Sequence, residues 1–111
     1  MERYAFEELD TLARYHLRFY KAYLNKQWIK EHDLEVREMI KSPPFEKLYV
    51  YTIEHALNQL NDEERSILTQ ENLKSCSKNW WMEYYSKSTY YRIKHRALTR
   101  FIHCLHHQSM V

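Results

Sequence analysis

Residues 84–107 read YYSKSTYYRIKHRALTRFIHCLHH, and this stretch decides the fold expected for the C-terminal third of the chain. Apolar side chains recur in it every three or four residues, which places them on one face of a helix. These residues are Tyr90, Ile93, Ala97, Phe101 and Leu105. The opposite face holds Lys87, Ser88, Tyr91, Arg92, His95 and Thr99. Ser86 stands at the N-cap, where free backbone N–H groups suit a phosphate. Two interpretations follow: an ordinary amphipathic surface helix, or a recognition helix for the major groove of DNA.

The segment preceding the prolines predicts one long helix over residues 2–41, with a break near His32. A stripe of apolar residues and one histidine supports the first part of this helix. Its members are Ala5, Leu9, Leu12, His16, Phe19 and Tyr23. A second set fits the same register poorly, so Asp33 can cap a separate short helix. That set is Trp28, Leu34, Val36, Met39 and Ile40. Ser42, Pro43 and Pro44 end the helical region.

Two further helices and a short one fill the middle of the chain. The first spans residues 45–60, with a face expected to be buried. That face consists of Leu48, Ile53, Ala56, Leu57 and Leu60. Asn61 or Asp62 then caps a helix that ends near residues 74–77, with Glu63 and Glu64 placed well against its dipole. Its inward residues are Ile67, Leu68 and Leu73. Ser77 or Asn79 begins a short helix through Trp80, Trp81 and Met82.

Composition agrees with an all-α fold of one compact domain. The chain has 111 residues, no glycine and only two prolines, which disfavours tight hairpins and excludes Gly-rich phosphate loops. We expect a long N-terminal helical region over residues 1–42, suited to oligomerisation, and a helical bundle over residues 43–111. Cys76 and Cys104 are interpreted as free thiols of a reduced compartment. Without a signal peptide or an apolar span, we expect a cytoplasmic protein with no membrane partner.

Charge is distributed unevenly along the chain. Residues 1–42 carry eight basic and eight acidic side chains, and residues 43–73 carry two basic and six acidic ones. Residues 74–111 carry seven basic side chains and a single acid, Glu83, which makes their net charge +6. A segregated basic segment is typical of a protein that binds a polyanion, although a solvated lysine-rich face has the same composition.

Two motifs in this C-terminal half resemble a known class of DNA-binding region. The run LNDEERSIL at residues 60–68, followed by a serine-initiated helix, is similar to region 4 of bacterial sigma factors. That helix matches at Ser86, Ile93, Ala97, Leu98 and Phe101. The pattern S-x-S-T-Y-Y-R-x-K-x-x-A over residues 86–97 is more similar still to the phage-type ArpU/RinA-like late transcriptional regulators of Gram-positive bacteria. The resemblance covers residues 60–105, and upstream of it only the helical character agrees.

This resemblance implies a sequence-specific transcriptional regulator that is encoded by a phage or mobile element of a Gram-positive bacterium and binds double-stranded DNA through a sigma region 4-like helix-turn-helix. Base edges would be contacted by Lys87, Ser88, Tyr91 and Arg92, with Arg92 the candidate guanine reader. Phosphates would be contacted by Thr89, Lys94, His95, Arg96 and Arg100. Thr89 can instead hydrogen-bond at the helix start. Tyr84 stands where such turns often place glycine or asparagine, so we expect this turn to be built differently.

Other functions have weaker support in the sequence. His103, Cys104, His106 and His107 lack the ligand spacing of a zinc site, and we expect no metal and no cofactor. No catalytic constellation is present, so we do not expect an enzyme. Trp80 and Trp81 could stack on bases, but we expect at least one of the pair to pack in the core. Two alternatives stay open: a helical interaction module that binds RNA polymerase, a phage component or itself without contacting DNA, and a small phage packaging subunit.

Overall fold

The computed structural model describes residues 5–33, 35 and 44–109, and it confirms an all-α fold with a long N-terminal helix and a helical bundle. Its elements are α1 (Phe6–His32), α3 (Pro44–Asn58), α4 (Asp62–Asn72), the 3₁₀ helix η1 (Trp80–Glu83) and α5 (Lys87–Ser109). No strand occurs within these described ranges. Some sequence-based expectations lie outside the described residues: the apolar set Leu34, Val36, Met39 and Ile40, and the end of the helical region at Ser42 and Pro43.

The helix α1 ends where the sequence predicts a break. The N–H of Asp33 donates to the carbonyl of Ile29 at 2.8 Å and closes the last turn. The buried residues of α1 are Leu9, Ala13 and Leu17, four apart. Of the predicted stripe, only Leu9 is fully buried. Of the other members of the stripe, His16 and Phe19 both contact the ring of Tyr49 on α3, and Leu12 packs partly buried against the main core.

The next two helices follow the sequence closely, with one error. Pro44 is the first residue of α3, a position where its missing N–H costs nothing. Leu48 was predicted to be buried but is 69 % exposed, because the core face of α3 is set by Val50, Ile53 and Leu57. Asn61 caps α4 as predicted, accepting from the N–H of Glu64 at 2.8 Å.

A segment of fourteen residues, 73–86, joins α4 to α5 and includes the single 3₁₀ turn η1. Asn79 precedes η1, as the sequence predicts, and Tyr84 follows it. Tyr84 has φ −113° and ψ −27°, and no described residue has a positive φ. The prediction that this turn avoids the left-handed conformation is therefore confirmed. The connection between the two helices is longer than a tight helix-turn-helix turn.

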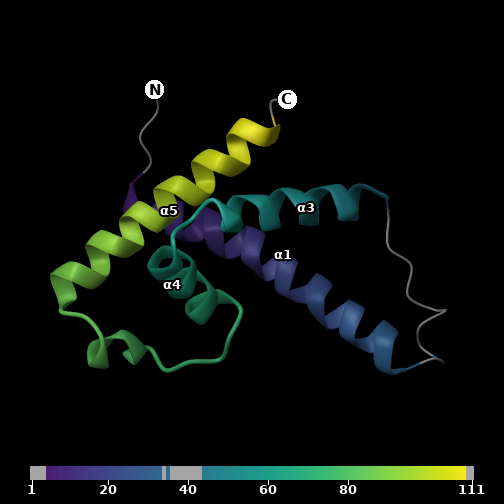
Figure 1. The fold of residues 1–111 in the computed structure, drawn as a ribbon, viewed down its shortest axis with the longest axis horizontal. Helices are drawn as coiled ribbons and strands as arrows, with labels where there is room; N and C mark the ends of the chain where they lie inside the picture. Colours follow the sequence, from purple (N-terminus) through teal and green to yellow (C-terminus); the bar gives the residue numbers. More distant parts are fainter. Residues whose placement is uncertain (1–4, 34, 36–43, 110–111) are drawn as a thin grey trace.

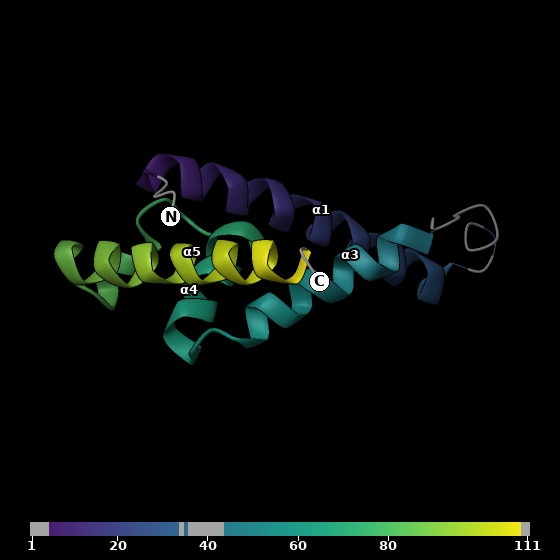
Figure 2. The same cartoon turned by 90° about the horizontal axis from the view of Figure 1, so that it is seen from above.

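The helices α1, α3, α4 and α5 all contribute to one main hydrophobic core. Its centre includes Leu17 of α1, Ile53 of α3, Leu68 of α4 and Phe101 of α5, each fully buried. In Figure 1, α5 runs above α4 and across the first half of α1. The second half of α1 and the first half of α3 extend together beyond α4 and α5, which is also visible from above in Figure 2. The bundle therefore has one thick end, built around α5, and one thin end.

Candidate nucleic-acid interface

The two faces of α5 separate as the sequence predicts. Tyr90, Ile93, Ala97, Phe101 and Leu105 are all buried. The predicted outer face is exposed along its whole length, and it consists of Lys87, Ser88, Tyr91, Arg92, His95 and Thr99. The part of the chain that the structure describes contains no acidic residue after Glu83. The outer face of α5 is thus positive without an internal counter-charge.

The start of α5 is fixed by its own side chains. The N–H of Thr89 donates to Oγ of Ser86 at 3.3 Å, which confirms Ser86 as the N-cap. Oγ of Ser86 in turn donates to Oγ1 of Thr89 at 2.9 Å. Of the two roles predicted for Thr89, the structure therefore shows the hydrogen bond at the helix start.

Aromatic packing holds this end of α5 against α4. The ring of Trp81 stacks on Tyr90 with centroids 4.4 Å apart and an interplanar angle of 8°. Nε1 of Trp80 donates to Glu71 at 3.1 Å, and the hydroxyl of Tyr90 donates to the same carboxylate. Burial and the Glu71 carboxylate raise the pKa of Tyr90, so its hydroxyl stays protonated as a donor. Trp80 and Trp81 thus act as scaffold residues.

Lys94 was predicted to contact phosphate, and the structure corrects this. Its side chain is buried between α1 and α4, where Nζ lies 2.8 Å from Glu71 and 3.6 Å from Asp10. The ammonium also lies 5.6 Å from the centre of the Phe6 ring. Lys94 follows Ile93 directly, and this register places it at the edge of the buried face. Because two carboxylates already hold its charge inside the molecule, Lys94 is not available to a nucleic acid.

Arg96 and Arg100 have a structural partner that the sequence did not reveal. Glu64 is fully buried, and its carboxylate accepts from Nε of Arg96 at 2.7 Å and from Nη1 of Arg100 at 3.2 Å. It also accepts from the N–H of Asn61 at 3.0 Å, which completes a capping box. Burial raises the pKa of the Glu64 carboxyl, but the hydrogen bonds from Asn61 and Arg96 and the positive charges of Arg96 and Arg100 lower it by more. The pKa of Glu64 therefore lies below its ordinary value. The two guanidinium groups therefore brace α5 against the start of α4, and only their half-exposed outer edges face solvent.

Two cations of the predicted interface, Lys87 and Arg92, are not paired with any other described residue. Lys87 and Arg92 form no ion pair and no hydrogen bond with any other residue that the structure describes. Tyr91 is 43 % exposed, with its ring edge against Phe6 and Trp81. The ring of His95 also lies against Phe6. The structure thus places Lys87, Ser88 and Arg92 in solvent at the capped end of α5.

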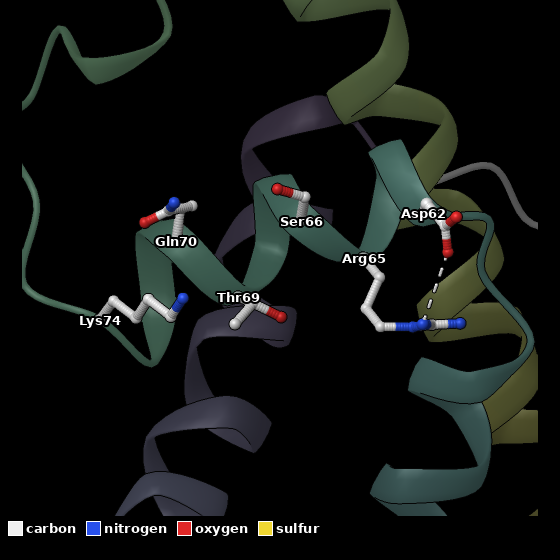
Figure 3. Close-up of a pocket in the computed structure, with 6 residues that line it drawn as sticks. All are labelled: Asp62, Arg65, Ser66, Thr69, Gln70 and Lys74. Atoms are coloured by element: carbon white, nitrogen blue, oxygen red, sulfur yellow. Dashed lines mark ion pairs between the residues drawn. The ribbon is translucent and has the colours of Figure 1, made fainter.

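A hollow of about 210 Å³ runs along the outer side of α4 (Figure 3). It is lined by Asp62, Arg65, Ser66, Thr69, Gln70 and Lys74, all on or just after one helix. Arg65 lies 3.8 Å from Asp62 and donates to the carbonyls of Leu57 and Leu60, so its charge is already used. With one uncommitted cation and a single helix as its wall, this hollow does not form a ligand site.

The histidine-rich end of α5 shows no metal geometry. Within the described ranges, no group of three or more histidine, cysteine or carboxylate side chains could hold an ion. The rings of His103 and His107 stack with centroids 6.0 Å apart. Cys104 is a half-buried free thiol, as expected, and Cys76 is free and exposed.

Comparison with protein-family models, curated proteins and solved structures finds no match. The similarity to sigma region 4 and to ArpU/RinA-like regulators therefore remains a resemblance in the motifs of residues 60–105. None of the helices in the described part of the chain has the length and apolar character that a bilayer crossing requires.

Proposed function

We propose that the protein is a sequence-specific regulator that binds double-stranded DNA and places the first turns of α5 in the major groove. The observation that carries this proposal is the outer face of α5, which is capped by Ser86 and free of acids, and on which Lys87 and Arg92 form no ion pair with any described residue. A major groove accepts one α-helix, and base edges are read by its first exposed side chains. The rigid seating of Tyr90 on Trp81 supports a fixed presentation of this face.

The residues divide into three roles under this proposal. Arg92 reads guanine through its two-pronged guanidinium group, and Lys87, Ser88 and Tyr91 contact neighbouring base edges. His95 lies further along the same face and contacts phosphate. Arg96 and Arg100 add to the phosphate attraction only through the guanidinium edges that Glu64 leaves exposed.

The test begins with selection of binding sites from a pool of random duplexes, followed by anisotropy titrations on the selected site. Arg92→Ala should weaken binding by about 1–3 kcal/mol and relax the preference at one base pair, because one bidentate contact is lost. Lys47→Ala is the matched control, since it removes the same charge from an exposed position on α3. Repeating the titration at two salt concentrations separates base readout from phosphate attraction.

Two results would reject the proposal. One is the absence of any selected duplex at low salt, where phosphate attraction is strongest. The other is equal binding by Arg92→Ala and the wild-type protein on a site that the wild type clearly selects. In either case the outer face of α5 would be a solvated or protein-binding surface.

A second candidate function, self-association, is supported by the thin end of the molecule. Apolar side chains are exposed there on both helices: Leu24 and Trp28 on α1, and Phe45, Leu48 and Tyr51 on α3. Regulators of this class gain affinity by reading two half-sites as dimers. Sedimentation velocity at high micromolar concentration should show a dimer that Trp28→Ser weakens. A strict monomer would exclude this candidate and leave the DNA-binding proposal unaffected.

A further inference from the structure

A second group of cations lies on the side of α1 that faces α4. Arg14, Arg18 and Lys21 are spaced by four and three residues, so they share one face of α1. Together with Glu71 and Asn72 at the end of α4, they line a groove of about 230 Å³. The groove is therefore formed by two helices, unlike the hollow along α4.

The one carboxylate in this groove is already neutralised from inside. Oε1 of Glu71 lies 2.8 Å from Nζ of Lys94, and Oε2 accepts from Trp80 and Tyr90. Glu71 consequently adds little negative charge to the groove, although it lines one wall.

The cations of the groove have fewer ion pairs than its one carboxylate, Glu71. Arg14 is paired with Asp10 at 2.8 Å, and Asp10 also lies 3.6 Å from Lys94. Arg18 and Lys21 form no ion pair or hydrogen bond within the described residues. Two full positive charges thus face solvent in a concave site, and Arg14 supplies part of a third.

We infer that this groove binds a phosphate group. An arginine and a lysine one turn apart match the needs of such an anion, because guanidinium groups donate in pairs and an ammonium adds a compact charge. Two sources share this chemistry: a small phosphorylated molecule and a phosphodiester of a nucleic-acid backbone. The inference stands apart from the proposed function, since it uses no residue of the outer face of α5.

A purely structural role makes a different prediction. The end of α4 carries partial negative charge, and its last turn contains no basic residue. Arg18 and Lys21 would then stabilise α4 through its dipole, without affinity for any ligand. Thermal unfolding and ligand binding must therefore be measured on the same variants.

The experiment is a calorimetric titration of the full chain with pyrophosphate, against sodium chloride at equal ionic strength. The wild-type protein should bind at one saturable site. The double variant Arg18→Ala/Lys21→Ala should bind about tenfold more weakly or worse, which corresponds to about 1.4 kcal/mol. Lys47→Ala/Lys78→Ala is the matched control, because it removes two exposed positive charges that lie outside both the groove and the outer face of α5, and it should leave pyrophosphate binding unchanged.

A parallel titration with duplex DNA distinguishes the two sources. If Arg18→Ala/Lys21→Ala also weakens duplex binding, the occupant is a backbone phosphodiester, and if only pyrophosphate binding is lost, it is a small phosphorylated molecule. The inference is overturned if pyrophosphate binds no better than chloride, or if both double variants lose affinity equally. It is also overturned if Arg18→Ala/Lys21→Ala lowers the melting temperature while pyrophosphate binding persists.

Discussion

Removing the carboxylate of Glu64 should destabilise the protein more than any change at a neighbouring acid. Glu64 is fully buried at the start of α4 and accepts hydrogen bonds from Asn61, Arg96 and Arg100. Glu64→Ala deletes all three of these bonds at once. It leaves the N–H of Asn61 without its partner in the capping box.

The size of the loss follows from these contacts. The capping interaction contributes about 1 kcal/mol. Each hydrogen bond to a charged group contributes about 1.5–3 kcal/mol when it is buried, but Arg96 and Arg100 are half exposed and recover water when Glu64 is gone. We therefore expect Glu64→Ala to lower the free energy of unfolding by about 2–4 kcal/mol. For a domain near this size, each kcal/mol lowers the melting temperature by about 4–8 °C.

The assay is urea unfolding followed by circular dichroism of the helices, with Glu63→Ala as the matched control. Glu63 lies one residue earlier in the same first turn but is exposed. Its removal therefore changes only the interaction with the helix dipole and the helix propensity at that position. We expect Glu63→Ala to cost less than about 1 kcal/mol. If the two variants differ by less than about 0.5 kcal/mol, Glu64 does not couple α4 to α5 through its hydrogen bonds to Arg96 and Arg100.

Acid titration provides an independent check on the same carboxylate. The pKa of Glu64 is lower in the folded protein than in the unfolded chain, so its contribution is present above the ordinary carboxyl pKa of about 4.3. That contribution disappears as the pH falls through the lowered folded-state pKa. The gap in stability between the wild-type protein and Glu64→Ala should therefore be constant near neutral pH and should narrow in acid.

Two further predictions concern Lys94, which is buried, and His16, which is partly buried. Lys94→Ala should lower the free energy of unfolding in urea by about 3–5 kcal/mol, because it leaves the carboxylates of Glu71 and Asp10 without their cation. The control Lys87→Ala, at an exposed position, should change it by no more than about 0.5 kcal/mol. Equal effects of the two variants would contradict the buried position of Lys94. Burial and then the charge of His106 lower the pKa of His16, so folding stability should decline as the pH falls below about 6.5. His16→Gln should reduce that decline between pH 7.5 and 5.5, and an unchanged pH dependence would show that His16 does not cause it.

Features that depend on local periodicity could be predicted from the sequence. The inner face of α5 repeats over four turns with few competing apolar positions, so one face was clearly favoured. In α3 the same reasoning failed at Leu48, because Phe45, Leu48 and Tyr51 form a second apolar face opposite Val50. Periodicity shows that a face is apolar, but the crossing of the helices decides which face is covered.

Ion pairs between helices could not be predicted in this way. Glu64 lies 32 residues from Arg96 and 36 from Arg100, so their meeting depends on how α4 packs on α5. The sequence did contain one signal, since Asn61 and Glu64 have the spacing of a capping box. A capping glutamate needs its carboxylate near the helix start, where cations from a neighbouring helix can also reach it.

The pairing of these charges changes the meaning of the basic C-terminal segment. Residues 74–111 carry seven basic side chains, and three of them, Lys94, Arg96 and Arg100, are bound to Glu64, Glu71 or Asp10. Much of the contrast between the acidic middle of the chain and its basic end is therefore neutralised within the fold. The other four basic residues of the segment are Lys74, Lys78, Lys87 and Arg92, which form no ion pair with described residues. Only Lys87 and Arg92 of these belong to α5, and the proposed function assigns both to base edges. Under that proposal few cations contact phosphates, and the salt dependence of DNA binding should be shallower than a net charge of +6 suggests.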